Sequence, residues 1–168
     1  MTKYVELNKL GSLSRGKSKH RPRNDKILFE NGDIPFIQTS DVKDAYLYIN
    51  HADTFYNKKG LAQSYLWKKD TLCITIAANI AETALLGIEA CFPDSIVGFI
   101  NDKSKCDIKY IKYCFDVLKN TYQQVSHGTS QENLNIENLN TLLIPYVNLE
   151  RQHHIVDNIT KGEEIYEN

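Results

Sequence analysis

The sequence lacks the cysteine and histidine patterns that hold metals or disulfides. Its four cysteines, Cys73, Cys91, Cys106 and Cys114, form no C-x-x-C pair, and no two of its five histidines stand at zinc-finger spacing. These absences argue against a structural metal site and against a disulfide framework. We expect four reduced and mostly buried thiols.

The sequence motifs of several enzyme classes are missing as well. The eight glycines never occur in G-x-G-x-x-G or G-x-x-x-x-G-K order, and no Asn or Asp precedes Pro-Pro-Tyr. There is no H-E-x-x-H, and Ser130 stands in no G-x-S-x-G motif. The order of Asp33 and Asp41-Val42-Lys43 only faintly resembles a nuclease pattern. The sequence therefore predicts no catalytic residue and no metal ligand, which favours a binding module.

Long apolar runs are absent. The longest apolar stretch, from Thr71 to Ile88, is broken by Asn79 and Glu82, so it is typical of buried strands and not of a membrane span. The first six residues lack the apolar core and cleavage site of a secretory signal. We expect a cytoplasmic protein with no membrane partner.

What is present suits one α+β domain with an appendage. The 168 residues are 42% hydrophobic and 24% charged, which allows a sizeable core. Residue patterns predict a short helix over 4–10 closed by Gly11, strands over 34–38, 46–49, 71–77, 83–86, 88–92 and 96–100, a helical turn over 57–63 and longer helices over 107–125 and 149–166. Polar loops are expected at 39–41 and 126–131. The predicted fold is a compact mixed or antiparallel β core with flanking helices.

Positive charge is concentrated in one short segment. The formal net charge is −1, yet residues 15–26, called here the basic window, hold six of the twenty Lys and Arg residues and one acid, Asp25. The window carries +5 and the rest of the chain −6. Such focusing is typical of a site for a polyanion, and the Gly, Ser and Pro content predicts a loop. The alternative is a solvated, mobile basic loop without a ligand.

Double-stranded DNA is the polyanion that we expect here, contacted by the basic window together with three polar loops. Lysines would set affinity and salt dependence, and a well-placed arginine would discriminate guanine by ~1–3 kcal/mol. The candidate contact residues are Arg15, Lys17, Ser18, Lys19, Arg21, Arg23, Thr39, Ser40, Lys43, Asn79, His127, Thr129, Ser130 and Gln131.

The C-terminal segment predicts a helix with a thin apolar seam. Ile155, Ile159, Gly162 and Tyr166 recur at helical spacing on an otherwise polar segment. A narrow seam favours pairing with another helix, so Ile155, Ile159 and Tyr166 are candidate partner or dimer contacts. The alternative is that the helix packs on its own domain. We place a recognition domain at 1–148 and the start of a coiled-coil-like spacer helix at 149–168.

Taken in order, these segments resemble the target-recognition domain of type I restriction-modification specificity subunits over nearly the whole chain. The segments that carry the resemblance are Leu7 to Leu10 with Gly11 before the basic window, Gly32 to Ile37 leading into Thr39 to Val42, Leu72 to Ile80, Gly128 to Gln131 followed by Leu134, Leu142 to Pro145, and Leu149 to Gln152 with Ile155-Val156.

The resemblance implies a non-catalytic subunit that reads DNA for separate modification and restriction subunits. S-adenosylmethionine, ATP and Mg²⁺ would then belong to those partners, and this chain would bind no cofactor. The family carries two recognition domains, whereas this sequence shows one, so we expect half a subunit that could pair as a homodimer through the C-terminal helix. Two alternatives stay open: a subunit remnant that acts as a protein-interaction module, and the recognition domain of a fused methyltransferase and nuclease.

Overall fold

A computed structural model describes the chain at residues 1–78, 80–128 and 134–167, without the side chains of 121–128 and 167. In chain order its elements are β1 (Lys3–Glu6), η1 (Leu7–Lys9), β2 (Gly11–Arg15), η2 (Lys26–Leu28), β3 (Ile34–Phe36), α1 (Thr39–Asp44), β4 (Tyr48–Ile49), β5 (Thr54–Tyr56), α2 (Lys58–Ala62), β6 (Leu72–Thr75), β7 (Thr83–Leu86), β8 (Ile96–Asn101), α3 (Ile108–Gly128), α4 (Ile136–Asn140), β9 (Leu143–Tyr146) and α5 (Leu149–Glu167).

The centre of the molecule is a five-stranded sheet in the order β2-β8-β6-β7-β4. Neighbouring strands are antiparallel except for β4 and β7, which pair in parallel. Strands β6 and β7 are buried along their whole length, as expected for short apolar segments flanked by turns. The predicted α+β fold with a mixed β core is therefore confirmed, and the strand predicted over 83–86 matches β7 residue for residue.

The predicted N-terminal helix is wrong. Residues Lys3–Glu6 form strand β1, which pairs with β9 near the other end of the sequence, and only Leu7–Lys9 make a 3-10 turn. Gly11 is no helix cap, since it opens β2. A Cβ at Gly11 would meet the Phe99 ring at 2.7 Å, so the glycine allows β2 and β8 to approach closely.

Two further local predictions fail. Residues 39–41 belong to helix α1 and not to a loop, because the Asp41 carboxylate accepts a hydrogen bond from the Gln38 N–H at 2.8 Å and closes the first turn. Residues 88–92 form no strand, because Ala90 bridges Trp67 whereas Cys91 bridges Phe36. This segment divides its backbone hydrogen bonds between two different neighbours.

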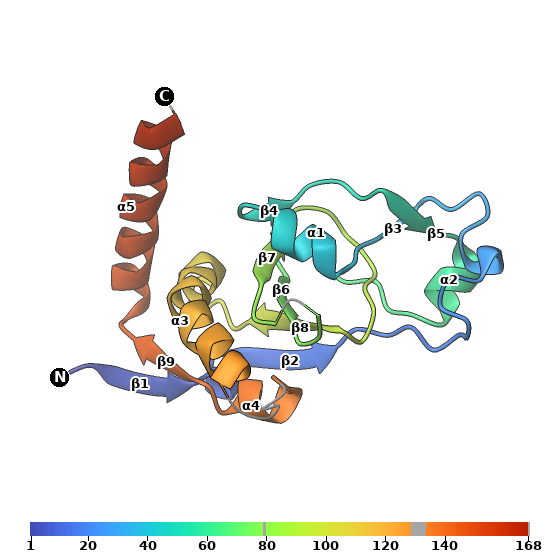
Figure 1. The fold of residues 1–168 in the computed structure, drawn as a ribbon. Coiled ribbons are helices and arrows are strands. Elements are labelled where there is room, and N and C mark those ends of the chain that lie inside the picture. Colours follow the sequence, from blue (N-terminus) through green and yellow to red (C-terminus); the bar gives the residue numbers. More distant parts are fainter. Residues whose placement is uncertain (79, 129–133, 168) are drawn as a thin grey trace.

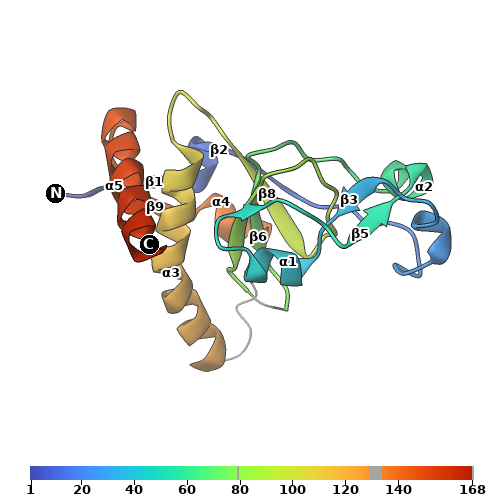
Figure 2. The same ribbon diagram turned by 90° about the horizontal axis from the view of Figure 1, so that it is seen from above.

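The two long helices lie side by side, and α3 covers the sheet. Helices α3 and α5 confirm the two longer helices that were predicted over 107–125 and 149–166. Both helices contribute to one hydrophobic core with β6, β7 and β8. Ile111 and Phe115 on α3 are fully or almost fully buried, and Val156 on α5 is 5% exposed. Figure 2 shows the pair from above, with α3 between α5 and the sheet.

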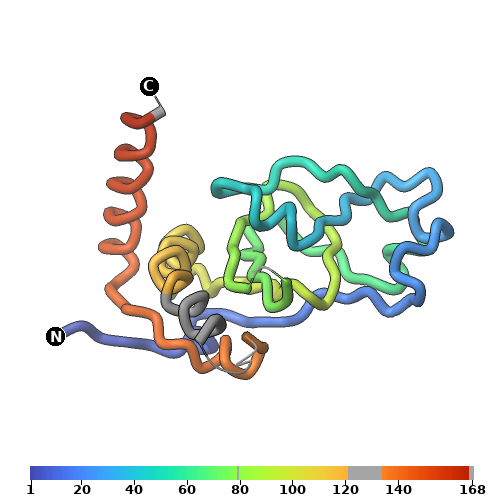
Figure 3. Tube along the Cα trace, viewed as in Figure 1, coloured from blue at the N-terminus to red at the C-terminus, as the bar shows by residue number. Residues whose placement is uncertain are grey.

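The basic window and helix α5 lie at opposite ends of the molecule (Figure 1). The window continues from the end of β2 towards α2, η2 and the β3–β5 ribbon. Both ends of the chain lie on the other side, with α5 (Figure 3). A ligand of the window would therefore leave the last turns of α5 uncovered.

Candidate nucleic-acid interface

The basic window is a loop, as predicted, between Arg15, which ends β2, and Lys26, which begins η2. Its first half is hydrogen-bonded to the body of the protein. The Gly16 N–H donates to the Ile96 carbonyl at 2.9 Å, and the Lys17 N–H donates to the Phe92 carbonyl at 3.1 Å. A Cβ at Gly16 would collide with the Phe92 ring, so this close approach requires glycine. The start of the window thus presents its side chains from a fixed backbone.

Two arginines of the window meet one carboxylate. Arg23 Nη2 donates to Asp94 Oδ1 at 2.8 Å, and Arg15 Nη2 lies 4.0 Å from Asp94 Oδ2. Arg15 Nε also donates to the Asp94 backbone carbonyl at 3.2 Å. Because all three side chains are between a third and just over half exposed, the guanidinium groups keep N–H donors facing solvent.

These arginines line two hollows on the surface. The larger, of about 620 Å³, is lined by Arg15, Arg23, Asp94, Ser95, Ile76 to Ala78, Ile80 and Leu134 to Glu137. The smaller, of about 430 Å³, is lined by Ser18, Arg23, Asn24, Phe29, Phe36, Gln38, Thr39, Thr54, Pro93 and Ser95. Arg23 and Ser95 line both hollows. The surface is therefore continuous from the N-terminus of α1 to the start of α4.

The predicted contact residues of the window take different positions. Lys17 and Lys19 are exposed, whereas Ser18 is buried and lines the smaller hollow. Arg21 donates to the Ser18 carbonyl at 2.6 Å and to the His20 carbonyl at 3.0 Å, so it braces the loop itself.

Outside the window, the predicted residues are brought together only in part. Thr39 lines the smaller hollow, and Ser40 and Lys43 are exposed on α1. His127 lies in the last turn of α3, where side chains are not described. Asn79, Thr129, Ser130 and Gln131 lie outside the described residues. Ala78 and Ile80, on either side of Asn79 in the sequence, line the larger hollow, as does Leu134, three residues after Gln131.

The main residue that the sequence reasoning missed is Asp94. Arg23 and Asp94 stand 71 positions apart, so no local pattern joins them. In the sequence, Pro93-Asp94 stands between the strands predicted over 88–92 and 96–100, where no functional pattern marks it. With Asp94 folded against the window, the local sum of charges falls from +5 to +4.

A second carboxylate, Asp25, belongs to the window itself. His20 Nε2 lies 2.8 Å from Asp25 Oδ2, and the Ile27 N–H donates to Asp25 Oδ1 at 3.1 Å. The hydrogen bond with His20, followed by that from Ile27, lowers the pKa of Asp25 below its usual value. Asp25 also caps η2, so it fixes the end of the window.

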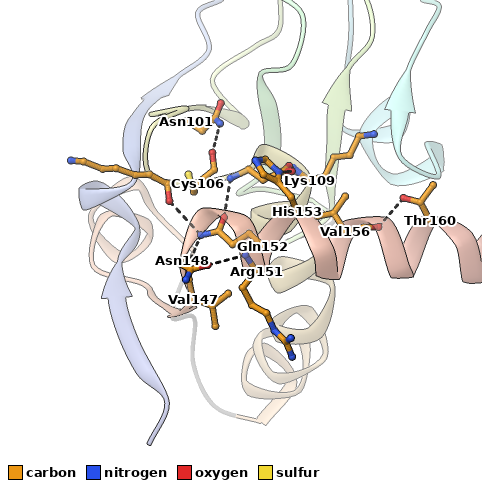
Figure 4. Close-up of polar contacts among 12 residues, drawn as sticks. Asn101, Cys106, Lys109, Val147, Asn148, Arg151, Gln152, His153, Val156 and Thr160 are labelled. Carbon is orange, nitrogen blue, oxygen red and sulfur yellow. Dashed lines mark hydrogen bonds and ion pairs between the residues drawn. The ribbon is translucent and has the colours of Figure 1, made fainter.

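At the opposite end, Gln152 attaches helix α5 to the domain (Figure 4). Its side chain is fully buried, and its Oε1 accepts from the Asp107 N–H at 2.9 Å. Its Nε2 donates to the Val147 carbonyl at 2.8 Å and to the Lys105 carbonyl at 3.3 Å. His153 Nδ1 lies 2.7 Å from Asp107 Oδ2 alongside. The start of α5 is thereby fixed to the start of α3.

The predicted partner residues of α5 divide into two groups. Ile155 packs against the core of its own domain, which agrees with the alternative stated for this helix. Ile159 is partly buried, whereas Ile165 and Tyr166 are 75% and 93% exposed. The apolar seam thus faces the domain at its start and solvent at its end.

The cysteines are free and buried, as predicted. Burial raises the pKa of the Cys114 thiol to about 11 and that of Cys106 to about 12. Among the described residues, no three His, Cys, Asp or Glu side chains gather as a metal site, and no helix is long and apolar enough to cross a membrane.

Solved structures with the same fold include specificity subunits of type I restriction-modification systems. The HsdS subunit from Thermoanaerobacter tengcongensis matches with a TM-score of 0.74 at 18% identity, over 97% of this chain and 37% of that one. The type I restriction-modification S subunit from M. genitalium matches with a TM-score of 0.68 at 16% identity, over 98% of this chain and 39% of that one. A third structure, from work on complex assembly and conformational transition of the type I R-M system, matches with a TM-score of 0.73 at 15% identity, over 97% of this chain and 38% of that one.

This chain therefore spans under two fifths of the length of those three chains. The TM-scores establish the shared fold, and at identities of 18% and below the three matches establish the fold alone. The family model of the type I restriction modification DNA specificity domain matches residues 3–166, which is nearly the whole sequence. The chain belongs to the family of type I restriction modification DNA specificity domains.

Proposed function

We propose that this chain reads a short sequence in double-stranded DNA through the surface that Arg15 and Arg23 share with the N-terminus of α1. One observation carries the proposal: the segment with the highest positive charge is hydrogen-bonded to the body of the protein and lines two adjoining hollows in a DNA specificity domain. Lys17 and Lys19 contact phosphates, and the half-exposed arginines reach base edges. Polar groups of the hollows, such as Thr39 and Ser95, add further contacts.

The chemistry of restriction and modification belongs, in this proposal, to other subunits. A modification subunit supplies methyl transfer with S-adenosylmethionine, and a restriction subunit uses ATP and Mg²⁺ in the cytoplasm. This chain contributes sequence recognition and binds no cofactor itself. The family membership and the resemblance of the sequence to a specificity subunit support this division of labour.

Selection from random duplexes tests the proposal. The purified chain, alone and with the modification subunit of its own system, is incubated with randomised double-stranded DNA, and bound molecules are sequenced. We expect one motif to be enriched, and we expect Arg23→Ala to lower the affinity of the chain for a duplex with that motif by about tenfold or more. Lys103→Ala is the matched control, because Lys103 is an exposed cation in the turn between β8 and α3.

Each outcome has a defined meaning. Enrichment only in the presence of the modification subunit means that the partner supplies most of the affinity, and the reading role stands. Equal losses for Arg23→Ala and Lys103→Ala would place recognition elsewhere on the chain. No enrichment by a folded protein under either condition would overturn the proposal.

A protein-interaction module is the second candidate, favoured by the end of α5. Ile165 and Tyr166 are largely exposed on the side opposite the basic window. Another copy of this chain or the modification subunit is the occupant to test there. Ile165→Ser with Tyr166→Ser would then weaken assembly, measured by sedimentation, and leave intrinsic DNA affinity unchanged.

A further inference from the structure

We infer that Asp94 is a positioning residue for DNA recognition, which holds the Arg23 guanidinium ready to contact a base. The inference rests on the proposed function, because it concerns the same surface. It adds that an acidic residue, unfavourable for DNA affinity by its charge, increases sequence discrimination. The observation that supports the inference is the 2.8 Å contact between Arg23 Nη2 and Asp94 Oδ1.

The backbone around Asp94 is fixed on several sides. The Ile96 N–H donates to the Pro93 carbonyl at 3.1 Å, which closes the turn that contains Asp94. The Ile76 N–H donates to the Ser95 carbonyl at 3.0 Å, and Pro93 is buried. Asp94 therefore extends from a rigid turn at the start of a central strand.

Arg23 extends from an exposed segment in the second half of the window. It lies in a turn in which the Asp25 N–H donates to the Pro22 carbonyl at 3.2 Å. A long side chain on such a segment loses rotamer freedom when it binds a base edge. The contact with Asp94 restricts that freedom before DNA arrives.

The contact leaves Arg23 able to read a base. A guanidinium has five N–H donors, and the bond to Asp94 uses one of them at Nη2. The remaining donors are enough for the paired contact that arginine makes with the O6 and N7 atoms of guanine. Arg15 keeps its hydrogen bond from Nε to the Asp94 backbone carbonyl after a side-chain substitution, and the substitution affects only the 4.0 Å contact between its Nη2 and Asp94 Oδ2.

Charge and geometry therefore act in opposite directions at Asp94. Its carboxylate repels the DNA backbone, so Asp94→Asn increases affinity for any duplex and makes the salt dependence steeper by up to about one unit of slope. The same substitution weakens the hold on Arg23, so preference for the selected motif over random duplex falls by up to about fivefold, which is the most that a half-exposed ion pair can supply. A residue with only a structural role would not move these two quantities apart.

A double-mutant cycle in the full chain tests the inference. Wild type, Asp94→Asn, Arg23→Ala and the double variant are titrated with the selected duplex and with random duplex at several salt concentrations. We expect Asp94→Asn to reduce discrimination in wild type and to leave it unchanged in the Arg23→Ala background. Glu30→Gln is the matched control, because it removes an exposed acid just beyond the window.

The outcomes separate the inference from the proposed function. Full discrimination by Asp94→Asn, or an equal effect of Asp94→Asn with and without Arg23, would overturn the positioning role while DNA reading stands. A loss of discrimination for Glu30→Gln as large as for Asp94→Asn would also overturn it. If wild type prefers no duplex over random DNA, both the proposed function and this inference fail.

Discussion

The two ends of the molecule fix their polar side chains by different means. At the base of α5, Gln152 is fully buried and bonds three backbone groups of neighbouring segments. In the basic window, the Asp94 side chain is 37% exposed and bonds the charged side chain of Arg23. Buried neutral hydrogen bonds fix a helix direction independently of salt, whereas exposed charges stay available to a ligand. The first end suits a frame and the second a reading surface.

The largest expected effect is at the buried end. Gln152→Leu removes all three hydrogen bonds and leaves the Asp107 N–H and the Val147 carbonyl without this partner, so stability falls by about 3 kcal/mol. Urea unfolding measures the loss. The control is Arg151→Ala, because the Arg151 side chain is exposed on the same turn. A loss below about 1 kcal/mol for Gln152→Leu would contradict the role of this residue in attaching α5.

A second pair of substitutions compares the two halves of α5. Val156→Ala removes a side chain that is 5% exposed, and we expect a loss of about 2 kcal/mol from lost burial and an added cavity. Ile165→Ala, at 75% exposure, is expected to change stability by less than about 0.5 kcal/mol. Thermal or urea unfolding gives both values. Equal losses would mean that the end of α5 is covered by another molecule in solution.

A smaller effect is expected at the reading surface. Asp94→Asn breaks a half-exposed ion pair with Arg23, and such pairs contribute less than about 1 kcal/mol. We expect urea unfolding in low and in high salt to show a small difference that salt reduces further. A large, salt-independent loss would show that Asp94 supports the fold, and the contrast between the two ends would then disappear.

The effect that is smallest at neutral pH, and develops only as the pH rises, concerns the buried thiols on the α5 side. Cys114 and Cys106 have pKa values raised by burial to about 11 and about 12, from 9.0 for an exposed thiol. The unfolded chain therefore loses these protons first, and stability falls as the pH rises from about 9 towards 12. Cys114→Ala should flatten this fall in a series of urea titrations. An unchanged slope would exclude Cys114 as its source.

Sequence reasoning located the elements whose signals are local. The recurrence of apolar residues every three or four positions, as at Ile108, Ile111 and Phe115, predicted α3, and the short apolar run at Thr83–Leu86 predicted β7. The prediction failed where two paired strands are far apart in the sequence. The apolar spacing of residues 4–10 predicted a helix, whereas β1 forms a strand because it pairs with β9. The start of α1 was missed although Asp41 follows Gln38 at the spacing of a helix cap.

The candidate site shows the same division. The excess of positive charge in residues 15–26 was readable because the cations are adjacent in sequence. The sequence did not predict that Arg23 is held by Asp94, because the two residues stand 71 positions apart. Sequence analysis gave Arg21 and Arg23 the same role as DNA contacts. In the structure, Arg21 donates to backbone carbonyls of the loop, whereas Arg23 donates to the Asp94 carboxylate beside the larger hollow.

The most direct measurement is an NMR titration of the full chain with its selected duplex, monitored at backbone amides and arginine side chains. We predict large shifts for Arg15 to Asn24, Gln38 and Ser95, and unchanged signals at the end of α5. Shifts concentrated at Ile159 to Tyr166, with the signals of Arg15 and Arg23 unmoved, would contradict this prediction.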